Sequence, residues 1–241
     1  MALSKEQIAA EVAAKGFELV DASGYKNMDS DIVVACGKGH KFVTNVHAVR
    51  HPSFQCPECA RSSFQVERPK AVPTKALGGF RIIAFDQATY KMGMSVWDDG
   101  KLVYYDLFQF NDQITEVRLA KIERLLSEVV VPIWKPDLVV FEDIQEQGGI
   151  KGMKTFKILA MLLGVCVTTM ERLGVKYITY APVVWRKEFG AISGGRSAEK
   201  NWAVNKVHEL TGQWVNEDTS EAILIGYSAW RKYQKPQVSL W

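Results

Sequence analysis

The fold prediction for this chain of 241 residues begins at the stretch Phe80-Arg81-Ile82-Ile83-Ala84-Phe85-Asp86. A short, mostly apolar run of this kind is typical of a strand buried in a sheet. Residues 92–97 then alternate in polarity, Asp98-Asp99-Gly100 is a strong turn signal, and residues 102–108 give a third strand. Because tight turns join the three strands, we expect them to be antiparallel.

The segments that follow alternate between helical and strand patterns. An apolar helical stripe at residues 114–129 ends near Pro132, and residues 137–141 form a short apolar strand. The later predicted elements are an apolar helix at 153–173, a strand at 175–180 and helices after Pro182, from Ser197 and from Asp218. The order β-β-β-α-β-α-β-α-α predicts a mixed α/β sheet flanked by helices.

Composition excludes several other classes of protein. Hydrophobic residues make up 47% of the chain and charged residues 24%, which excludes a disordered, collagen-like or coiled-coil protein. The longest apolar run, residues 158–170, is shorter than the about 20 residues that span a bilayer, so we expect neither a transmembrane helix nor a membrane partner. The first residues do not form a secretory signal, which predicts a cytoplasmic protein, in the host cytoplasm if it is viral. The net charge of +3 is too small to identify a nucleic-acid binder.

The amino-terminal part has a different organisation. Ser4 and Gln7 form a capping box for a short helix that ends at Gly16, and residues 36–59 carry cysteines and histidines. Residues 65–79 are rich in proline, glycine and basic residues, which is typical of a linker. We therefore predict a small module at residues 1–68, a linker at 69–79 and the α/β domain at 80–241.

The module carries a predicted zinc site with the ligands Cys36, His40, Cys56 and Cys59. Two close pairs separated by 15 residues can supply the four tetrahedral ligands of one structural Zn²⁺, and a closed site of this kind serves binding or docking rather than catalysis. His47 or His51 is the alternative fourth ligand, and two unrelated loops with buried thiols are the alternative to a metal site. Cys166 lies in the apolar helix and is expected to be a core residue.

Four carboxylates form the second predicted site. Asp86 and Glu142 follow the first and fourth strands, and Asp218 and Glu221 are three residues apart at the start of the last helix. Strand ends and one helix face can bring these acids together, where their repulsion favours two Mg²⁺ or Mn²⁺ ions about 3.5–4 Å apart that hydrolyse a phosphodiester. Alternatively, a strand-end Asp is a turn residue, and Asp218 and Glu221 form a helix cap and its capping box.

The strand order and these acids together resemble the ribonuclease H-like fold, and more specifically the RuvC-type Holliday junction resolvases. The resemblance covers roughly residues 80–233 and is strongest to bacteriophage members, some of which carry an added zinc-binding segment. The matching motifs are Ile83-Ala84-Phe85-Asp86-Gln87-Ala88-Thr89 with Gly93, Val139-Val140-Phe141-Glu142, Tyr180-Ala181-Pro182 before Arg186 and Lys187, and Asp218-Thr219-Ser220-Glu221-Ala222.

The resemblance implies a homodimeric, magnesium-dependent endonuclease, with no organic cofactor, that nicks two opposed strands of a four-way DNA junction during recombination and repair. Asp86, Glu142, Asp218 and Glu221 would then hold the metals. Two departures limit the transfer: Gln145 stands where cellular relatives often have an aromatic residue, and Glu221 stands where many have Asp. Cleavage-sequence preference is therefore not carried over.

Basic residues complete the predicted site. Lys187 and Lys200 are expected to assist catalysis and Arg186 to bind DNA, because a cation beside the attacked phosphate offsets charge in the transition state. Arg196, Lys151 and Lys154 are expected to contact DNA. Solvated helix charges are the alternative for these lysines.

Three functions remain open from the sequence. The leading hypothesis is a four-way junction endonuclease, and the alternatives are a ribonuclease H-like nuclease acting on other branched DNA or hybrids, and a non-catalytic zinc-containing DNA-binding protein. The apolar helix at 153–173 must be buried either by a partner subunit or by the domain's own sheet.

Overall fold

The computed structural model describes residues 3–62, 69, 71–145, 149–190 and 196–233. Its contacts divide the chain into two compact units. The N-terminal unit comprises Met1–Gln65 with Asn111–Lys121, and the main unit comprises Val66–Phe110 with Ile122–Trp241.

The main unit is built on a mixed sheet of five strands. These are β4 (Arg81–Gln87), β5 (Lys91–Asp98), β6 (Lys101–Gln109), β7 (Leu138–Glu142) and β8 (Tyr177–Tyr180). Their order is β6-β5-β4-β7-β8, with β4, β5 and β6 antiparallel and β7 and β8 parallel to β4 and β7 respectively. The predicted mixed sheet and the antiparallel pairing of its first three strands are confirmed.

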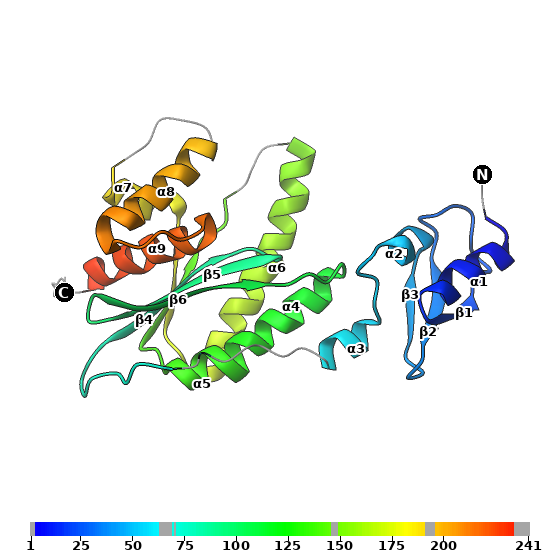
Figure 1. Cartoon of the computed structure of the whole chain (residues 1–241), viewed down its shortest axis with the longest axis horizontal. Coiled ribbons are helices and arrows are strands. Elements are labelled where there is room, and N and C mark those ends of the chain that lie inside the picture. Colours follow the sequence, from blue (N-terminus) through cyan, green and yellow to red (C-terminus); the bar gives the residue numbers. More distant parts are fainter. Residues whose placement is uncertain (1–2, 63–68, 70, 146–148, 191–195, 234–241) are drawn as a thin grey trace, which may run out of the picture. The chain divides into compact units, whose positions relative to one another are not determined.

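Helices cover both faces of this sheet. The helices after β6 are α4 (Thr115–Arg124), η1 (Leu125–Val130), α5 (Val131–Trp134), α6 (Gly149–Leu173), α7 (Pro182–Glu188), α8 (Arg196–Thr211) and α9 (Glu217–Tyr233). Figure 1 shows α7, α8 and α9 over one face of the sheet and α5 and α6 over the other. The sheet is therefore the middle of three layers.

Successive side chains of a strand point to opposite faces of the sheet, and this alternation determines which face Asp86 and Glu142 occupy. Ile82 and Ala84 of β4 pack in one core cluster with Val140 of β7 and Ile223 of α9. Because side chains two residues apart share a face of a strand, Asp86 continues this row towards α9. Glu142 follows Val140 in the same way, so both strand-end acids face the layer of α7, α8 and α9.

The helix after β6 differs from its predicted end near Pro132. It continues through the π-helical turn η1 into α5 and ends at Trp134, where Lys135 adopts a left-handed conformation with φ 48°. A proline ring inside a regular helix clashes with the carbonyl four residues earlier, and a wider π turn relieves that clash. The proline is thus accommodated rather than terminating the helix.

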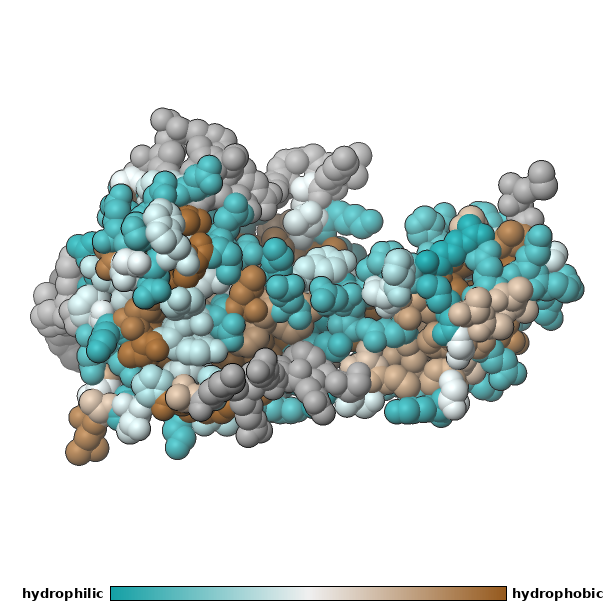
Figure 2. Space-filling model, viewed as in Figure 1, coloured by the Kyte–Doolittle hydropathy of each residue, from teal (hydrophilic) through white to brown (hydrophobic). Residues whose placement is uncertain are grey.

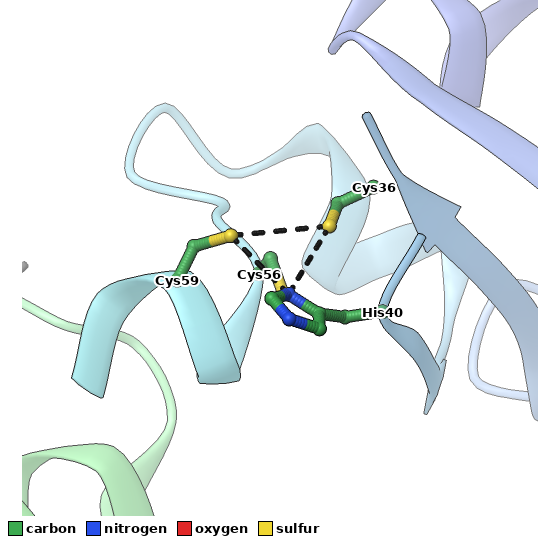
Figure 3. A group of neighbouring side chains, drawn as sticks. All are labelled: Cys36, His40, Cys56 and Cys59. Carbon is green, nitrogen blue, oxygen red and sulfur yellow. Dashed lines mark hydrogen bonds between the residues drawn. The ribbon is translucent and has the colours of Figure 1, made fainter. Parts of the chain in front are cut away.

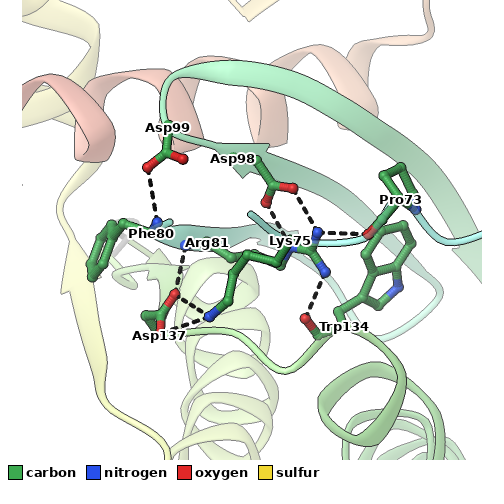
Figure 4. Close-up of polar contacts among 8 residues, drawn as sticks. All are labelled: Pro73, Lys75, Phe80, Arg81, Asp98, Asp99, Trp134 and Asp137. Atoms are coloured by element: carbon green, nitrogen blue, oxygen red, sulfur yellow. Dashed lines mark hydrogen bonds and ion pairs between the residues drawn. The ribbon is translucent and has the colours of Figure 1, made fainter. Parts of the chain in front are cut away.

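One buried and one half-buried ion pair hold the segment before β4 against the sheet (Figure 4). The guanidinium of Arg81 is buried, forms two hydrogen bonds of 2.6 Å to Asp98 and donates to the Pro73 carbonyl at 2.8 Å. Lys75 donates to Asp137 at 2.7 Å. These contacts fix residues 73–75, which belong to the predicted linker, on the start of the sheet.

The N-terminal unit contains a sheet that the sequence did not predict. Its elements are α1 (Lys5–Ala14), β1 (Phe17–Asp21), β2 (Ile32–Cys36), β3 (Lys41–Thr44), α2 (Val46–Arg50) and α3 (Pro57–Ser62), with strand order β1-β2-β3. The predicted capping box of Ser4 and Gln7 is confirmed at the start of α1. A small core joins α1, through Ile8 and Val12, to Ile32 and Val34 of β2.

The long helix α6 is only partly covered. Its segment Gly152–Leu173 has the length and composition of a membrane span, although only 22% of its most apolar window is buried in the structure. Its position as the connection between the parallel strands β7 and β8 accounts for the buried residues Leu162, Cys166 and Met170. Met153 and Met161 are exposed. In the view of Figure 2, apolar patches are interspersed with hydrophilic surface over the main unit.

Candidate active site

The start of α9 lies directly against the strand that pairs with Asp86. Asp86 of β4 is opposite Gly93 of β5 in the sheet register. A Cβ at position 93 would lie 2.2 Å from the carbonyl oxygen of Asp218, so only glycine allows this approach. The contact brings the first turn of α9 beside Asp86.

The cap of α9 is Asn216 rather than Asp218. The Asn216 Oδ1 accepts a hydrogen bond of 2.9 Å from the backbone N–H of Thr219. The alternative interpretation of Asp218 as the cap is therefore wrong, and its carboxylate is not used in that role. Asp218 and Glu221 are one turn apart, at a spacing that places both on one face of the helix.

Electrostatic interactions link all four predicted acids. Burial raises the pKa of Asp86 well above its usual range, and the charges of Glu142, Glu221 and Asp218 raise it further. Burial, followed by repulsion from Glu221, raises the pKa of Glu142 to about 7. The four carboxylates therefore act on one another electrostatically near the end of β4 and β7.

Two cations balance part of this charge. The Arg186 Nη2 lies 2.9 Å from the Glu221 Oε1, and the Arg186 charge lowers the pKa of both Asp86 and Glu142 against the larger effects of burial. Lys91 Nζ lies 3.9 Å from the Asp218 Oδ2. The effect of Arg186 on both pKa values is smaller than that of burial.

Solved structures share the fold of this chain, whereas sequence comparisons find no relative. No protein-family model matches the sequence, and no curated protein matches it. RuvC of T. thermophilus in complex with a Holliday junction substrate matches with a TM-score of 0.52 and 14% identity, over 65% of this chain and 96% of that one. The chain contains the RuvC fold.

Two further solved structures match over similar lengths. A second Thermus thermophilus RuvC structure has a TM-score of 0.49 and 15% identity, over 64% of this chain and 96% of that one. The Fowlpox virus resolvase in complex with Holliday junction DNA has a TM-score of 0.42 and 15% identity, over 65% of this chain and 100% of the other.

The acids of this RuvC-like sheet suit hard divalent cations. Mg²⁺ and Mn²⁺ prefer carboxylate oxygens, and they bind where the protein leaves negative charge uncompensated. Asp86, Glu142, Asp218 and Glu221 supply such oxygens, and after the larger effect of burial the neighbouring carboxylates also raise the pKa of Asp86 and Glu142. The chemistry of these donors therefore suits a divalent cation, whereas the described ligand atoms that already lie within 4.8 Å of one another are those of Cys36, His40, Cys56 and Cys59.

The remaining predicted basic residues divide into two groups. Lys187 of α7 and Lys154 of α6 are exposed. Lys151 lies on α6, and Arg196 and Lys200 lie on the first turns of α8, but their side chains are outside the described part of the chain. Of the predicted cations with described side chains, Arg186 is the one joined to the acids by a hydrogen bond.

The structure adds residues that the sequence analysis missed. The indole Nε1–H of Trp185 donates to the Glu142 Oε1 at 3.0 Å. The side chain of Gln87 exchanges hydrogen bonds with the backbone of Glu142. Neither residue carries a local signal of its role, because that of Gln87 depends on the register of β4 against β7 and that of Trp185 on the packing of α7 beside Glu142.

The four predicted zinc ligands lie together within the N-terminal unit (Figure 3). The ligand atoms of Cys36, His40, Cys56 and Cys59 all lie within 4.8 Å of one another. Cys36 Sγ is 3.9 Å from Cys59 Sγ, and the His40 Nδ1 is 3.4–3.6 Å from the three sulfur atoms. A tetrahedral Zn²⁺ with Zn–S of about 2.3 Å places its ligand atoms about 3.5–3.8 Å apart, so the cluster fits zinc.

The hairpin between β2 and β3 explains why His40, rather than His47 or His51, lies beside the three thiols. Cys36 ends β2, and the backbone N–H of Cys36 donates to the His40 carbonyl at 3.0 Å, which closes the turn that carries both ligands. His51 Nδ1 instead contacts Ser53 at 3.1 Å, and His47 is exposed. Among the described residues, His40 is thus the histidine beside the thiols.

We expect Glu142→Gln to stabilise the protein in the absence of added divalent ions. The pKa of Glu142 is about 7 in the folded state against 4.5 ordinarily, so the folded protein binds this proton more tightly than the unfolded chain does. The free energy of unfolding of the wild type therefore falls as pH rises from about 4.5 to 7, whereas Gln does not ionise. Above pH 7 the variant should melt about 3 °C or more higher in thermal unfolding.

The matched control is Glu188→Gln, which replaces an exposed acid of α7. Its melting temperature should stay within about 1 °C of the wild type at every pH, as is usual for surface substitutions. Equal curves for Glu142→Gln and the wild type between pH 4.5 and 8 would contradict the buried acid cluster.

Proposed function

We propose that this protein is a divalent-metal-dependent endonuclease that resolves four-way DNA junctions, of the type found in bacteriophages. The observation that carries the proposal is the cluster of Asp86, Glu142, Asp218 and Glu221 at one end of a RuvC-like sheet. T. thermophilus RuvC, whose fold the chain shares, was solved with a Holliday junction substrate. The bacteriophage assignment rests on the resemblance of the sequence motifs and on the added zinc module.

The four acids would hold two Mg²⁺ or Mn²⁺ ions. When bound, such ions activate a water molecule and stabilise the leaving oxygen of a phosphodiester. Arg186 lies against Glu221 and would offset negative charge that develops on the attacked phosphate. Lys187 and Lys200 would act as further cations beside the phosphate. Glu142 accepts a hydrogen bond from the indole N–H of Trp185.

Junction DNA would meet a positively charged surface around these acids. Lys154 of α6, Lys151 one turn earlier and Arg196 at the start of α8 would contact its phosphates. Because these three residues would contact phosphates and not bases, they would not determine the DNA sequence at which the protein cuts.

A homodimer would present two such sites to the two opposed strands. The residues of α6 that the sheet leaves open, including Met153 and Met161, offer an apolar surface for a second subunit. A twofold axis would relate the two acid clusters and match the approximate symmetry of a four-way junction. The zinc module would dock DNA or protein through its surface, with Zn²⁺ as a structural ion.

Substrate competition tests the proposal. With Mg²⁺ present, the protein should cut a four-way junction about tenfold or more faster than a flap, an RNA–DNA hybrid or plain duplex of the same sequence. Equal rates on flaps or hybrids would replace the junction assignment with a broader nuclease. Binding of junction DNA without any metal-dependent cleavage would instead support a non-catalytic DNA-binding protein.

A further inference from the structure

Two residues outside the acid cluster hold Glu142 from different elements. Trp185, on α7, is fully buried, and its indole N–H donates to the Glu142 Oε1 at 3.0 Å. Gln87, the last residue of β4, is also buried and contacts the Glu142 backbone. We propose that Trp185 and Gln87 are positioning residues that orient Glu142 for divalent-metal binding, an inference that rests on the proposed function.

Gln87 extends the strand pairing to Glu142. The parallel register of β4 and β7 runs from Ile82 opposite Leu138 to Phe85 opposite Phe141, and Glu142 is the next residue. Its backbone N–H donates to the Gln87 Oε1 at 3.0 Å, and its carbonyl accepts from the Gln87 amide. A side-chain amide therefore fixes the backbone of Glu142 just beyond the last backbone pair between β4 and β7.

Trp185 holds the side-chain carboxylate of Glu142, whereas Gln87 holds its backbone. A neutral indole N–H is a donor only, so its hydrogen bond is made to a carboxylate oxygen that accepts and favours the charged form that a metal ion needs. The bond occupies Oε1 and restricts rotation of the carboxylate. With backbone and carboxylate both held, Oε2 is directed by the protein before a metal ion arrives, which lowers the entropic cost of binding.

The two roles of Trp185 are separable by substitution. Its ring packs in the core cluster of α7, α8 and α9, beside Trp202 at a centroid distance of 6.5 Å. Trp185→Phe keeps an aromatic ring at this position and removes the donor. Partners that orient metal ligands typically contribute 10- to 100-fold to metal affinity, so loss of the indole N–H should be measurable.

Calorimetric titration of the zinc-loaded protein with Mn²⁺ tests the inference. Trp185→Phe should bind Mn²⁺ about tenfold more weakly than the wild type. Trp134→Phe is the matched control, because Trp134 is equally buried but packs against Tyr104 at the opposite end of the main sheet. It should bind Mn²⁺ with wild-type affinity. Equal affinity of Trp185→Phe and the wild type, or an equal loss in both variants, would overturn the assignment.

A second variant, at Gln87, tests the inference even if Trp185→Phe does not fold. Gln87→Met has a side chain of similar length without hydrogen-bonding groups, and it should also weaken Mn²⁺ binding about tenfold. Wild-type affinity in a folded Gln87→Met would overturn the role of Gln87. If the wild type binds Mn²⁺ but cuts no DNA, the proposed function fails, and the titrations still decide whether Trp185 and Gln87 orient Glu142. If the wild type binds no Mn²⁺, both the proposed function and this inference fail.

Discussion

Asp86→Asn is expected to reduce metal-dependent cleavage of a four-way junction by about 10³-fold or more while leaving junction binding intact. Asparagine matches the shape of Asp86 but removes the charge at the centre of the cluster, where Glu142, Glu221 and Asp218 all act on it. Metal ions contribute several kcal/mol of transition-state stabilisation, and each 1.4 kcal/mol is a factor of ten in rate. Single-turnover cleavage and a binding titration in Ca²⁺ measure the two quantities separately.

The matched control for this variant is Asp99→Asn. Asp99 lies in the turn between β5 and β6 at the other end of the strands, with φ 46°, a conformation that asparagine tolerates well. Its cleavage rate should equal that of the wild type. Asp86→Asn should also melt no lower than the wild type, because it removes repulsion among buried acids. Full cleavage by Asp86→Asn would exclude it from the metal site and with it the proposed chemistry.

The sequence was sufficient to predict the sheet and the position of its acids. Residues 82–85 form a continuous apolar run because both faces of β4 are covered, and such a run can be recognised without a structure. Asp86 and Glu142 directly follow buried strands, so parallel pairing of β4 with β7 was enough to bring them together. Asp218 and Glu221 were predicted from their spacing of three residues at the start of the last helix.

Other features depend on tertiary contacts that local patterns do not encode. Asn216 and Asp218 are equally good caps by residue type, and only the approach of α9 to Gly93 separates them. Trp185 has the composition of a core residue, and its donor role exists only because α7 passes beside Glu142. Strand β3 has four residues that alternate between exposed and half-buried, which is too short a pattern to predict a strand.

Removal of zinc is expected to unfold the N-terminal unit and to leave the main sheet folded. The cluster ties the hairpin of β2 and β3, through Cys36 and His40, to α3, through Cys56 and Cys59. The small core under α1 is of a size that is marginal without a metal or disulfide, and structural zinc contributes on the order of 10 kcal/mol to small domains. Chelation should therefore abolish the amide signals of β1, β2 and β3 in a nuclear magnetic resonance spectrum and preserve those of β4 and β7.

Cysteine variants give the same test without a chelator. Cys59→Ser should lose the bound zinc, measured as metal content per chain, whereas Cys166→Ala should retain one ion because Cys166 is buried in α6, outside the cluster. Neighbouring thiols raise the pKa of Cys59 to about 11, after the larger effect of burial, so three thiols at this distance resist ionising together unless a cation joins them. A Cys59→Ser protein that keeps zinc, or a metal-free unit that keeps its folded signals, would show that the core of α1 and β2 is sufficient and that the four ligands are only neighbours.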